Sequence, residues 1–187
     1  MLRDTQAFFA ERAATWDERF PDDDAAFAAA IAELSPPREG VVVDLGCGTG
    51  RALAHFTTAR TVIGVDVTRE MLAVAHSKQR GLLACADASR LPMRDNTVDA
   101  FLAAGLLTHV PDAQALLVEL RRVGTRSARL AIFHPIGRAA LARRHGRELR
   151  PDELLDPSVL PGVLAAAGWH TERIDDGDDR YLALATL

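Results

Sequence analysis

A glycine-rich turn with a carboxylate just before it is the strongest chemical signal in this sequence. The turn covers residues 46–50, which read Gly-Cys-Gly-Thr-Gly, and it follows the apolar run Val41–Leu45, which contains Asp44. Glycines allow tight turns and a close approach of the backbone to a ligand, and a helix that starts there offers unpaired N–H groups. Asp44 attracts an ammonium group and repels phosphate. The pattern predicts a cationic, nucleotide-like ligand, with a plain strand-to-helix turn as the alternative.

Two further carboxylates stand at the ends of the next two apolar runs. Asp66 follows Thr61–Val65, and Asp87 follows Leu82–Ala86. A carboxylate at the first position can accept both hydroxyl protons of a ribose. A carboxylate beside a backbone N–H at the second can meet the amine and a ring nitrogen of a purine. Either aspartate alone is also explained as a helix cap or a loop residue. With Asp44, they match an adenosine that carries an amino acid.

The spacing of the glycines separates this turn from two other nucleotide-binding loops. The glycines occur at every second position, whereas the dinucleotide fingerprint is Gly-x-Gly-x-x-Gly. The Gly-Lys-Ser/Thr sequence of a Walker loop is absent. An NAD-dependent oxidoreductase on a similar sheet is therefore a disfavoured alternative.

From about residue 40 onward, short apolar runs alternate with helical stretches. Helices are expected over 50–59, 68–79 and 112–123. Continuous apolar strands separated by helices are typical of a parallel sheet covered on both faces, and right-handed crossovers make such a sheet doubly wound. The strands expected in this part are Val41–Leu45, Thr61–Val65, Leu82–Ala86, Val98–Ala104 and Ala128–Phe133.

The end of the chain breaks this alternation. A helix ends at Gly168, and Trp169–Ile174 and Arg180–Leu187 then read as two strands. The segment between them is too short for a crossover helix, so the pair must be antiparallel. The predicted fold is α/β and doubly wound: a mostly parallel, Rossmann-like seven-stranded sheet with a C-terminal antiparallel hairpin.

The first part of the chain predicts helices without strands. Residues 5–20 read as a helix with apolar anchors that include Trp16 and Phe20, a break follows at Pro21, and a second amphipathic helix ends near residue 35. We divide the chain into an N-terminal helical lid, residues 1–37, and a ligand-binding domain, residues 38–187. Trp16 and Arg19 could cap the ligand from the lid, with surface packing as the alternative.

Composition limits the possible partners. The chain has 187 residues, of which 48% are hydrophobic and 26% charged, as in globular domains. A net charge of −4 argues against nucleic acid. Two unpaired cysteines and unsuitable histidine spacings argue against a metal site. No apolar run reaches the roughly 20 residues of a membrane helix, and the first residues lack the apolar core of a signal peptide. A cytoplasmic location is therefore expected.

Taken together, the motifs resemble those of the class I S-adenosylmethionine-dependent methyltransferases of the methyltransferase-11 type. Residues 41–51 are similar to the first motif of that family, 62–72 to its second strand and following helix, and 87–93 to its adenine loop. Residues 130–135 and the terminal hairpin resemble its last strands. The family's Lys-Pro-Gly-Gly turn is replaced here by residues 123–127, remote from the cofactor. The resemblance runs from about residue 38 to the end and is specific for the cofactor rather than the substrate.

The resemblance implies S-adenosyl-L-methionine as the cofactor. The glycine turn would pass beneath its methionine portion, Asp44 would hold its ammonium group, Asp66 its ribose, and Asp87 with Ala88 its adenine. Backbone near Ala104 would meet the amino-acid end. The expected cofactor-binding residues are Asp44, Gly46, Cys47, Gly48, Asp66, Val67, Asp87, Ala88 and Ala104.

Methyl transfer from a sulfonium is an in-line displacement with a neutral leaving group, so that the protein mainly supplies alignment. A base is needed only when the acceptor carries a proton of high pKa. His109 and His134, just after the fourth and fifth strands, are the candidate catalytic residues, with loop packing as the alternative. His145 and the remaining histidines are expected at helical or outer positions. Cys47 is expected to fit the turn rather than to act as a nucleophile.

The predicted function is methyl transfer to a small-molecule acceptor. A non-catalytic cofactor-binding regulator or partner subunit is the main alternative. The arginine-rich stretch Arg138–Arg150 could contact an acidic or phosphorylated acceptor, with a solvated helix face as the alternative. Monomer and dimer both stay open.

Overall fold

A computed structural model describes residues 2–19, 23–78 and 81–187, and it contains one seven-stranded sheet. The strand order is β3-β2-β1-β4-β5-β7-β6. Neighbouring strands from β3 to β5 are parallel, whereas β7 is antiparallel to both β5 and β6. The predicted fold class is therefore confirmed. The strands are β1 (Val41–Leu45), β2 (Thr61–Asp66), β3 (Leu82–Cys85), β4 (Val98–Ala104), β5 (Gly124–His134), β6 (His170–Asp176) and β7 (Tyr181–Thr186).

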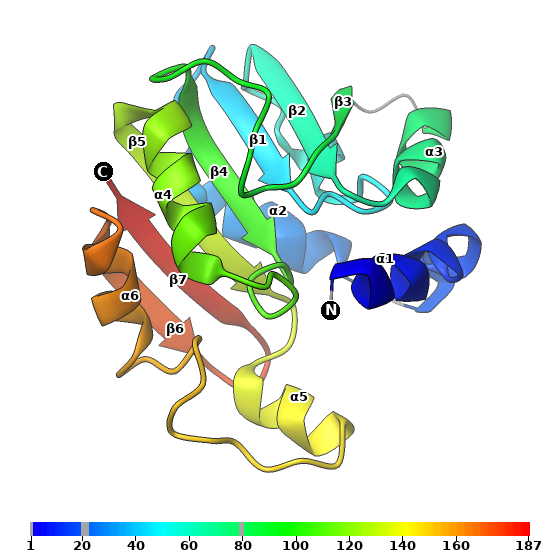
Figure 1. The fold of residues 1–187 in the computed structure, drawn as a ribbon, viewed down its shortest axis with the longest axis vertical. Coiled ribbons are helices and arrows are strands. Elements are labelled where there is room, and N and C mark those ends of the chain that lie inside the picture. Colours follow the sequence, from blue (N-terminus) through cyan, green and yellow to red (C-terminus); the bar gives the residue numbers. More distant parts are fainter. Residues whose placement is uncertain (1, 20–22, 79–80) are drawn as a thin grey trace.

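Helices cover both faces of the sheet (Figure 1). The larger apolar core lies between the sheet and α4 and α6, and a second core lies between the other face and α2. Both α1 and α5 lie at the edge towards which the parallel strands point. The α-helices are α1 (Leu2–Ala10), α2 (Asp24–Leu34), α3 (Arg69–Ser77), α4 (Ala113–Val123), α5 (Arg138–Arg144) and α6 (Leu160–Ala166).

Helix α4 illustrates how sequence pattern and packing agree in this fold. Its N-cap, Asp112, accepts a hydrogen bond from the Ala115 amide at 2.9 Å, which satisfies one of the free donors of the first turn. Its apolar stripe is fully buried against the sheet. The indole N–H of Trp169 donates to the Leu117 carbonyl at 3.1 Å and links the start of the hairpin to the helix.

The N-terminal segment differs from the single helix expected over residues 5–20. Helix α1 ends at Ala10, and two 3₁₀ turns follow, η1 (Ala13–Thr15) and η2 (Asp17–Arg19). Asp17 in η2 bonds with Thr49 in the glycine turn and with Lys78, which directly follows α3. These tertiary contacts override the helical pattern. Phe20 and the break predicted at Pro21 lie outside the described residues.

The helix expected over residues 50–59 is a single 3₁₀ turn, η3 (Ala52–His55). Gly50 has a φ of +77°, and a Cβ there would lie 3.1 Å from Cβ of Ala75 in α3. The glycine turn therefore packs tightly on α3 and delays the return to helical geometry. Strand β5 begins at Gly124, earlier than the expected Ala128, because the C-cap of α4 is already extended and leads directly into the strand.

Candidate functional site

A cavity of about 570 Å³ opens at the carboxyl ends of the parallel strands. Its walls combine strand ends, the N-terminal segment and α5. Every residue proposed from the sequence as a cofactor or catalytic residue lines it. They are Asp44, Gly46, Cys47, Gly48, Asp66, Val67, Asp87, Ala88, Ala104, His109 and His134, and Trp16 and Arg19 line it as well.

The glycine turn forms the floor of the cavity. Gly46 and Gly48 have φ angles of +65° and +53°, which favour glycine. A Cβ on Gly46 would also lie only 3.0 Å from Leu106. The turn is held to β2 by the Cys47 amide, which donates to the Val65 carbonyl at 3.0 Å. Side chains at these glycines would strain the turn and fill the space above it.

Cys47 is packed beneath the turn rather than presented to a substrate. Its Sγ lies 2.8 Å from the place where a Cβ on Gly64 would stand, so the thiol fills the gap left by that glycine. Burial raises the pKa of the thiol, and the neighbouring carboxylates raise it further. The thiol therefore stays protonated, as suits a small residue that completes a turn.

Asp44 is a buried carboxyl group with an unsatisfied oxygen. Its relative exposure is 1%, and no described residue offers its Oδ2 a hydrogen bond. Burial, assisted by the negative charge of Asp66, raises its pKa to about 8. Buried carboxylates are costly unless they are paired. A cationic group is the partner that this position needs.

Asp66 is organised by the glycine turn itself. Its Oδ2 accepts from the Gly48 amide at 2.9 Å, and its Oδ1 accepts from the Thr68 amide at 2.8 Å. Burial raises its pKa, and these backbone bonds oppose the rise. Each carboxylate oxygen has a second lone pair, so both can accept a hydroxyl from a ligand. The carboxylate is thus held by the turn and keeps acceptor capacity on both oxygens, as a vicinal diol requires.

Asp87 is fixed by a local turn of the chain after β3. Its Oδ1 accepts from both the amide and the hydroxyl of Ser89 at 2.8 Å. Both bonds use the same oxygen, so Oδ2 is left for a ligand amine. The next residue, Ala88, is buried. This arrangement suits the edge of an adenine ring.

The N-terminal segment closes one side of the cavity. Asp17 accepts a hydrogen bond from the Thr49 hydroxyl at 2.5 Å and forms an ion pair with Lys78. Lys78 also donates to the Thr49 carbonyl at 2.8 Å. Phe9 packs edge-on against both Trp16 and His109, with ring centroids 5.2 Å and 5.3 Å away. The N-terminal segment therefore contacts the glycine turn through the polar contacts of Asp17, and it contacts His109 through the ring of Phe9.

The two candidate histidines lie on the far side of the cavity. Burial lowers the pKa of both rings, which favours their neutral form. In His134, Nδ1 lies 2.8 Å from the Ile136 carbonyl and 3.1 Å from the Ile136 amide, so its role as donor or acceptor depends on the tautomer. A ring that donates there carries its lone pair on Nε2. Either histidine can therefore take up a proton.

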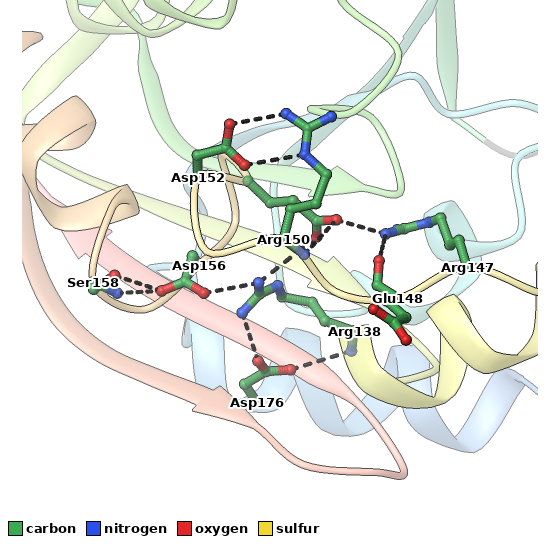
Figure 2. Close-up of polar contacts among 9 residues, drawn as sticks. Arg138, Arg147, Glu148, Arg150, Asp152, Asp156, Ser158 and Asp176 are labelled. Carbon is green, nitrogen blue, oxygen red and sulfur yellow. Dashed lines mark hydrogen bonds and ion pairs between the residues drawn. The ribbon is translucent and has the colours of Figure 1, made fainter.

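The basic stretch after β5 is already neutralised in large part. Figure 2 shows the guanidinium of Arg138 between Asp156 and Asp176, at 3.0 Å from each carboxylate. Arg138 is buried, so the solvated-face interpretation is wrong for this residue. Arg147 pairs with Glu153 and Arg150 with Asp152, both at exposed positions.

Several lining residues were not expected from the sequence. Tyr181, at the start of β7, and Leu141 and His145, in and just after α5, line the cavity. His145 was expected at a helical or outer position and not in the cavity. Tyr181 is the chain's single tyrosine, which could have drawn attention to it, but nothing in the local pattern connects the last strand with a ligand.

In residues 2–19, 23–78 and 81–187, no group of three or more histidine, cysteine or acidic side chains is arranged to hold a metal ion. No helix in this part of the chain is both long and apolar enough to span a bilayer.

Comparison with known proteins shows similarity to methyltransferases. Residues 43–132 match the family described as a methyltransferase domain. The chain is 36% identical over 109 residues to methyltransferase GfsG of Streptomyces halstedii, of which it covers 39%. It is 28% identical over 173 residues to a demethylmenaquinone methyltransferase of Roseiflexus sp., covering 76% of this chain and 73% of the relative.

A solved structure supports the same conclusion for the fold. An S-adenosylmethionine-dependent methyltransferase from Aquifex aeolicus superposes with a TM-score of 0.66 and 23% identity, over 84% of this chain and 87% of the other. The chain therefore has the fold of an S-adenosylmethionine-dependent methyltransferase, and its central part is similar to a methyltransferase domain.

Proposed function

We propose that this protein transfers the methyl group of S-adenosylmethionine to a small-molecule acceptor. The observation that carries the proposal is the unsatisfied, buried carboxyl of Asp44, which lies beneath a glycine turn and in the same cavity as Asp66 and Asp87. Few ligands present an ammonium, a vicinal diol and a purine edge along one molecule. The residues present fit this cofactor.

In this proposal, each part of the cavity has its own role. Asp44 pairs with the ammonium group of the methionine portion, and Gly46 and Gly48 let the backbone approach it. Asp66 accepts the ribose hydroxyls. Asp87 and Ala88 hold the adenine edge. Cys47, Val67 and Ala104 complete the walls of this end of the cavity.

The bound cofactor supplies an activated methyl group on a sulfonium. The chain then has to align the acceptor and exclude competing water, and such alignment is worth about 7–11 kcal/mol in favourable cases. Where the acceptor carries a proton, the neutral ring of His134 or His109 takes it up. His134 is the better candidate because its Nδ1 contact to the Ile136 carbonyl orients the ring.

Calorimetric titration tests the cofactor assignment. We expect binding of S-adenosylmethionine and of S-adenosylhomocysteine, and no binding of NAD. Binding of NAD alone would reject the proposal. Transfer of labelled methyl into a metabolite extract then distinguishes an active enzyme from a non-catalytic binder, which binds the cofactor and labels nothing.

We also propose the division into a lid, residues 1–37, and a cofactor domain, residues 38–187. The contacts of Asp17 with Thr49 and Lys78 support it, because they connect the two parts beside the cavity. We further propose that the protein is cytoplasmic and does not bind nucleic acid. Its oligomeric state, monomer or dimer, stays open. Cell fractionation and sedimentation of the purified protein would test location and oligomeric state.

A further inference from the structure

The hydroxyl of Tyr181 is a buried polar group without a partner. The residue is 1% exposed and lines the cavity, and none of the described residues forms a hydrogen bond with its Oη. An unsatisfied buried hydroxyl destabilises a protein, so it is normally retained for a reason. None of the cofactor roles described above uses it.

A second unsatisfied donor lies in the same end of the cavity. Arg138 also lines the cavity, and its side chain is 8% exposed. Its two terminal nitrogens bond to Asp176 and Asp156, as Figure 2 shows, but its buried Nε has no partner among the described residues. Two buried donors without acceptors thus line one part of the wall.

The register of the sheet connects these donors with His134. Tyr181 on β7 lies directly opposite His134 on β5 and opposite Asp176 on β6. Side chains of directly opposed residues lie on the same face of a sheet, with Cβ atoms about 4.5–5.5 Å apart. Asp176 in turn holds Arg138. The unsatisfied donors therefore lie next to the candidate base, in a row that leads away from β4.

The charges around the row select for a neutral ligand. Arg138 has three carboxylates within 4 Å, from Glu153, Asp156 and Asp176. The charge of Arg138 is therefore already compensated, and Arg147, which also lines the cavity, pairs with Glu153, so neither guanidinium offers an unpaired positive charge to an anion. Burial raises the pKa of Tyr181, and Asp176 adds to this, so that the hydroxyl stays a neutral donor. Its natural partner is an uncharged oxygen.

We propose that Tyr181, supported by Arg138, forms an acceptor subsite that binds a neutral oxygen, such as a carbonyl, of the methyl acceptor. The assignment of this subsite to the acceptor rests on the proposed function. The substrate class that follows is an uncharged, largely apolar molecule bearing a carbonyl, ether or hydroxyl oxygen. This oxygen holds the molecule beside His134.

Three probes of similar shape test the subsite: acetophenone, isopropylbenzene and benzoate. Their affinities are measured by saturation-transfer NMR for the wild-type protein and for Tyr181→Phe, with and without saturating S-adenosylhomocysteine. We expect the substitution to weaken acetophenone binding about fivefold, the effect of one neutral hydrogen bond. Isopropylbenzene binding should stay unchanged, and the thermal midpoint should not fall, because the hydroxyl lost has no partner.

A matched control is available in β6. Thr171 has another buried hydroxyl oxygen without a partner, and it does not line the cavity. Thr171→Val should leave all three probes unaffected. Failure of wild-type protein to bind acetophenone, or equal losses of acetophenone and isopropylbenzene in Tyr181→Phe, would overturn the subsite. Tighter binding of benzoate than of acetophenone would overturn its preference for a neutral ligand. Failure of S-adenosylhomocysteine to bind would instead refute the proposed function.

Discussion

The two ends of the cavity are built on different principles. The end proposed for the cofactor contains the three acidic lining residues of the described chain, Asp44, Asp66 and Asp87. Asp44 and Asp66 belong to β1 and β2, Asp87 lies two residues after β3, and backbone amides donate to the last two. The other end combines His134, Tyr181 and other residues from β4, β5 and α5.

This difference indicates which end of the cavity suits a ligand common to many enzymes and which end suits a ligand specific to this protein. Because the cofactor always has the same structure, carboxylates at the ends of successive parallel strands can bind its separate parts. Methyl acceptors differ from one enzyme to another. In our proposal, the contacts to the acceptor come from α5, in the connection after β5, and from the C-terminal hairpin. The following predictions test whether the two ends act separately.

His134→Ala should have the largest effect, and it should affect only the acceptor end. We expect transfer of labelled methyl to fall about 100-fold or more if the ring takes up a proton during the reaction. The dissociation constant of S-adenosylmethionine should stay within a factor of two. Full activity of the variant would leave His134 a packing residue.

Asp66→Ala should lower cofactor affinity, which His134→Ala should leave unchanged. Loss of charge-assisted hydrogen bonds should weaken S-adenosylmethionine binding by about 1–3 kcal/mol, measured by calorimetry. Asp112→Ala is the control, because it removes the N-cap of α4 and should cost about 1 kcal/mol of stability without changing cofactor affinity. Unchanged affinity in Asp66→Ala would exclude Asp66 from the ribose role.

Asp44 should make cofactor binding depend on pH. Its pKa is about 8 in the cofactor-free protein, against an ordinary value of 3.8, so the carboxyl is largely protonated at pH 6. A cationic ammonium needs the ionised form, so binding releases a proton, and affinity should rise from pH 6 to pH 8. Calorimetry in buffers of different ionisation enthalpy measures this proton. Asp44→Asn should bind more weakly and lose the dependence.

The same shift affects the stability of the cofactor-free protein. A folded-state pKa above the unfolded value means that the folded protein binds the proton more tightly. The stabilisation is fully present below pH 3.8 and is lost as the pH rises towards 8. Chemical unfolding should show Asp44→Asn gaining stability relative to wild type over this range. An equal pH profile for both proteins would contradict the burial of Asp44.

Lys78→Met should have the smallest effect. It removes the ion pair with Asp17, a partly exposed contact between the N-terminal segment and the end of α3. Such pairs contribute up to about 1 kcal/mol, so cofactor affinity should fall two- to fivefold at low salt. Arg150→Met, which breaks the exposed pair with Asp152, should change nothing. A comparable effect of both substitutions would argue against a closing role for the segment.

Much of the sheet could be predicted because each strand is a continuous apolar run bounded by a turn. Strand β4 has the predicted bounds, and the short turn between β6 and β7 was enough to predict the antiparallel end. The helices near the site were harder. Residues 50–59 form only a 3₁₀ turn, because Gly50 packs against α3, a contact that no local pattern encodes.

For this protein, the sequence alone determined the class of fold and the strand-end carboxylates that line the cavity, because both depend on residues close together in the chain. Only the tertiary structure decided that Tyr181 lies beside His134, and that three carboxylates surround Arg138. These pairings join segments far apart in sequence, whose proximity depends on how β5, β7 and α5 pack. The physical reason is that strand register and helix packing, rather than local propensity, bring distant side chains to one place.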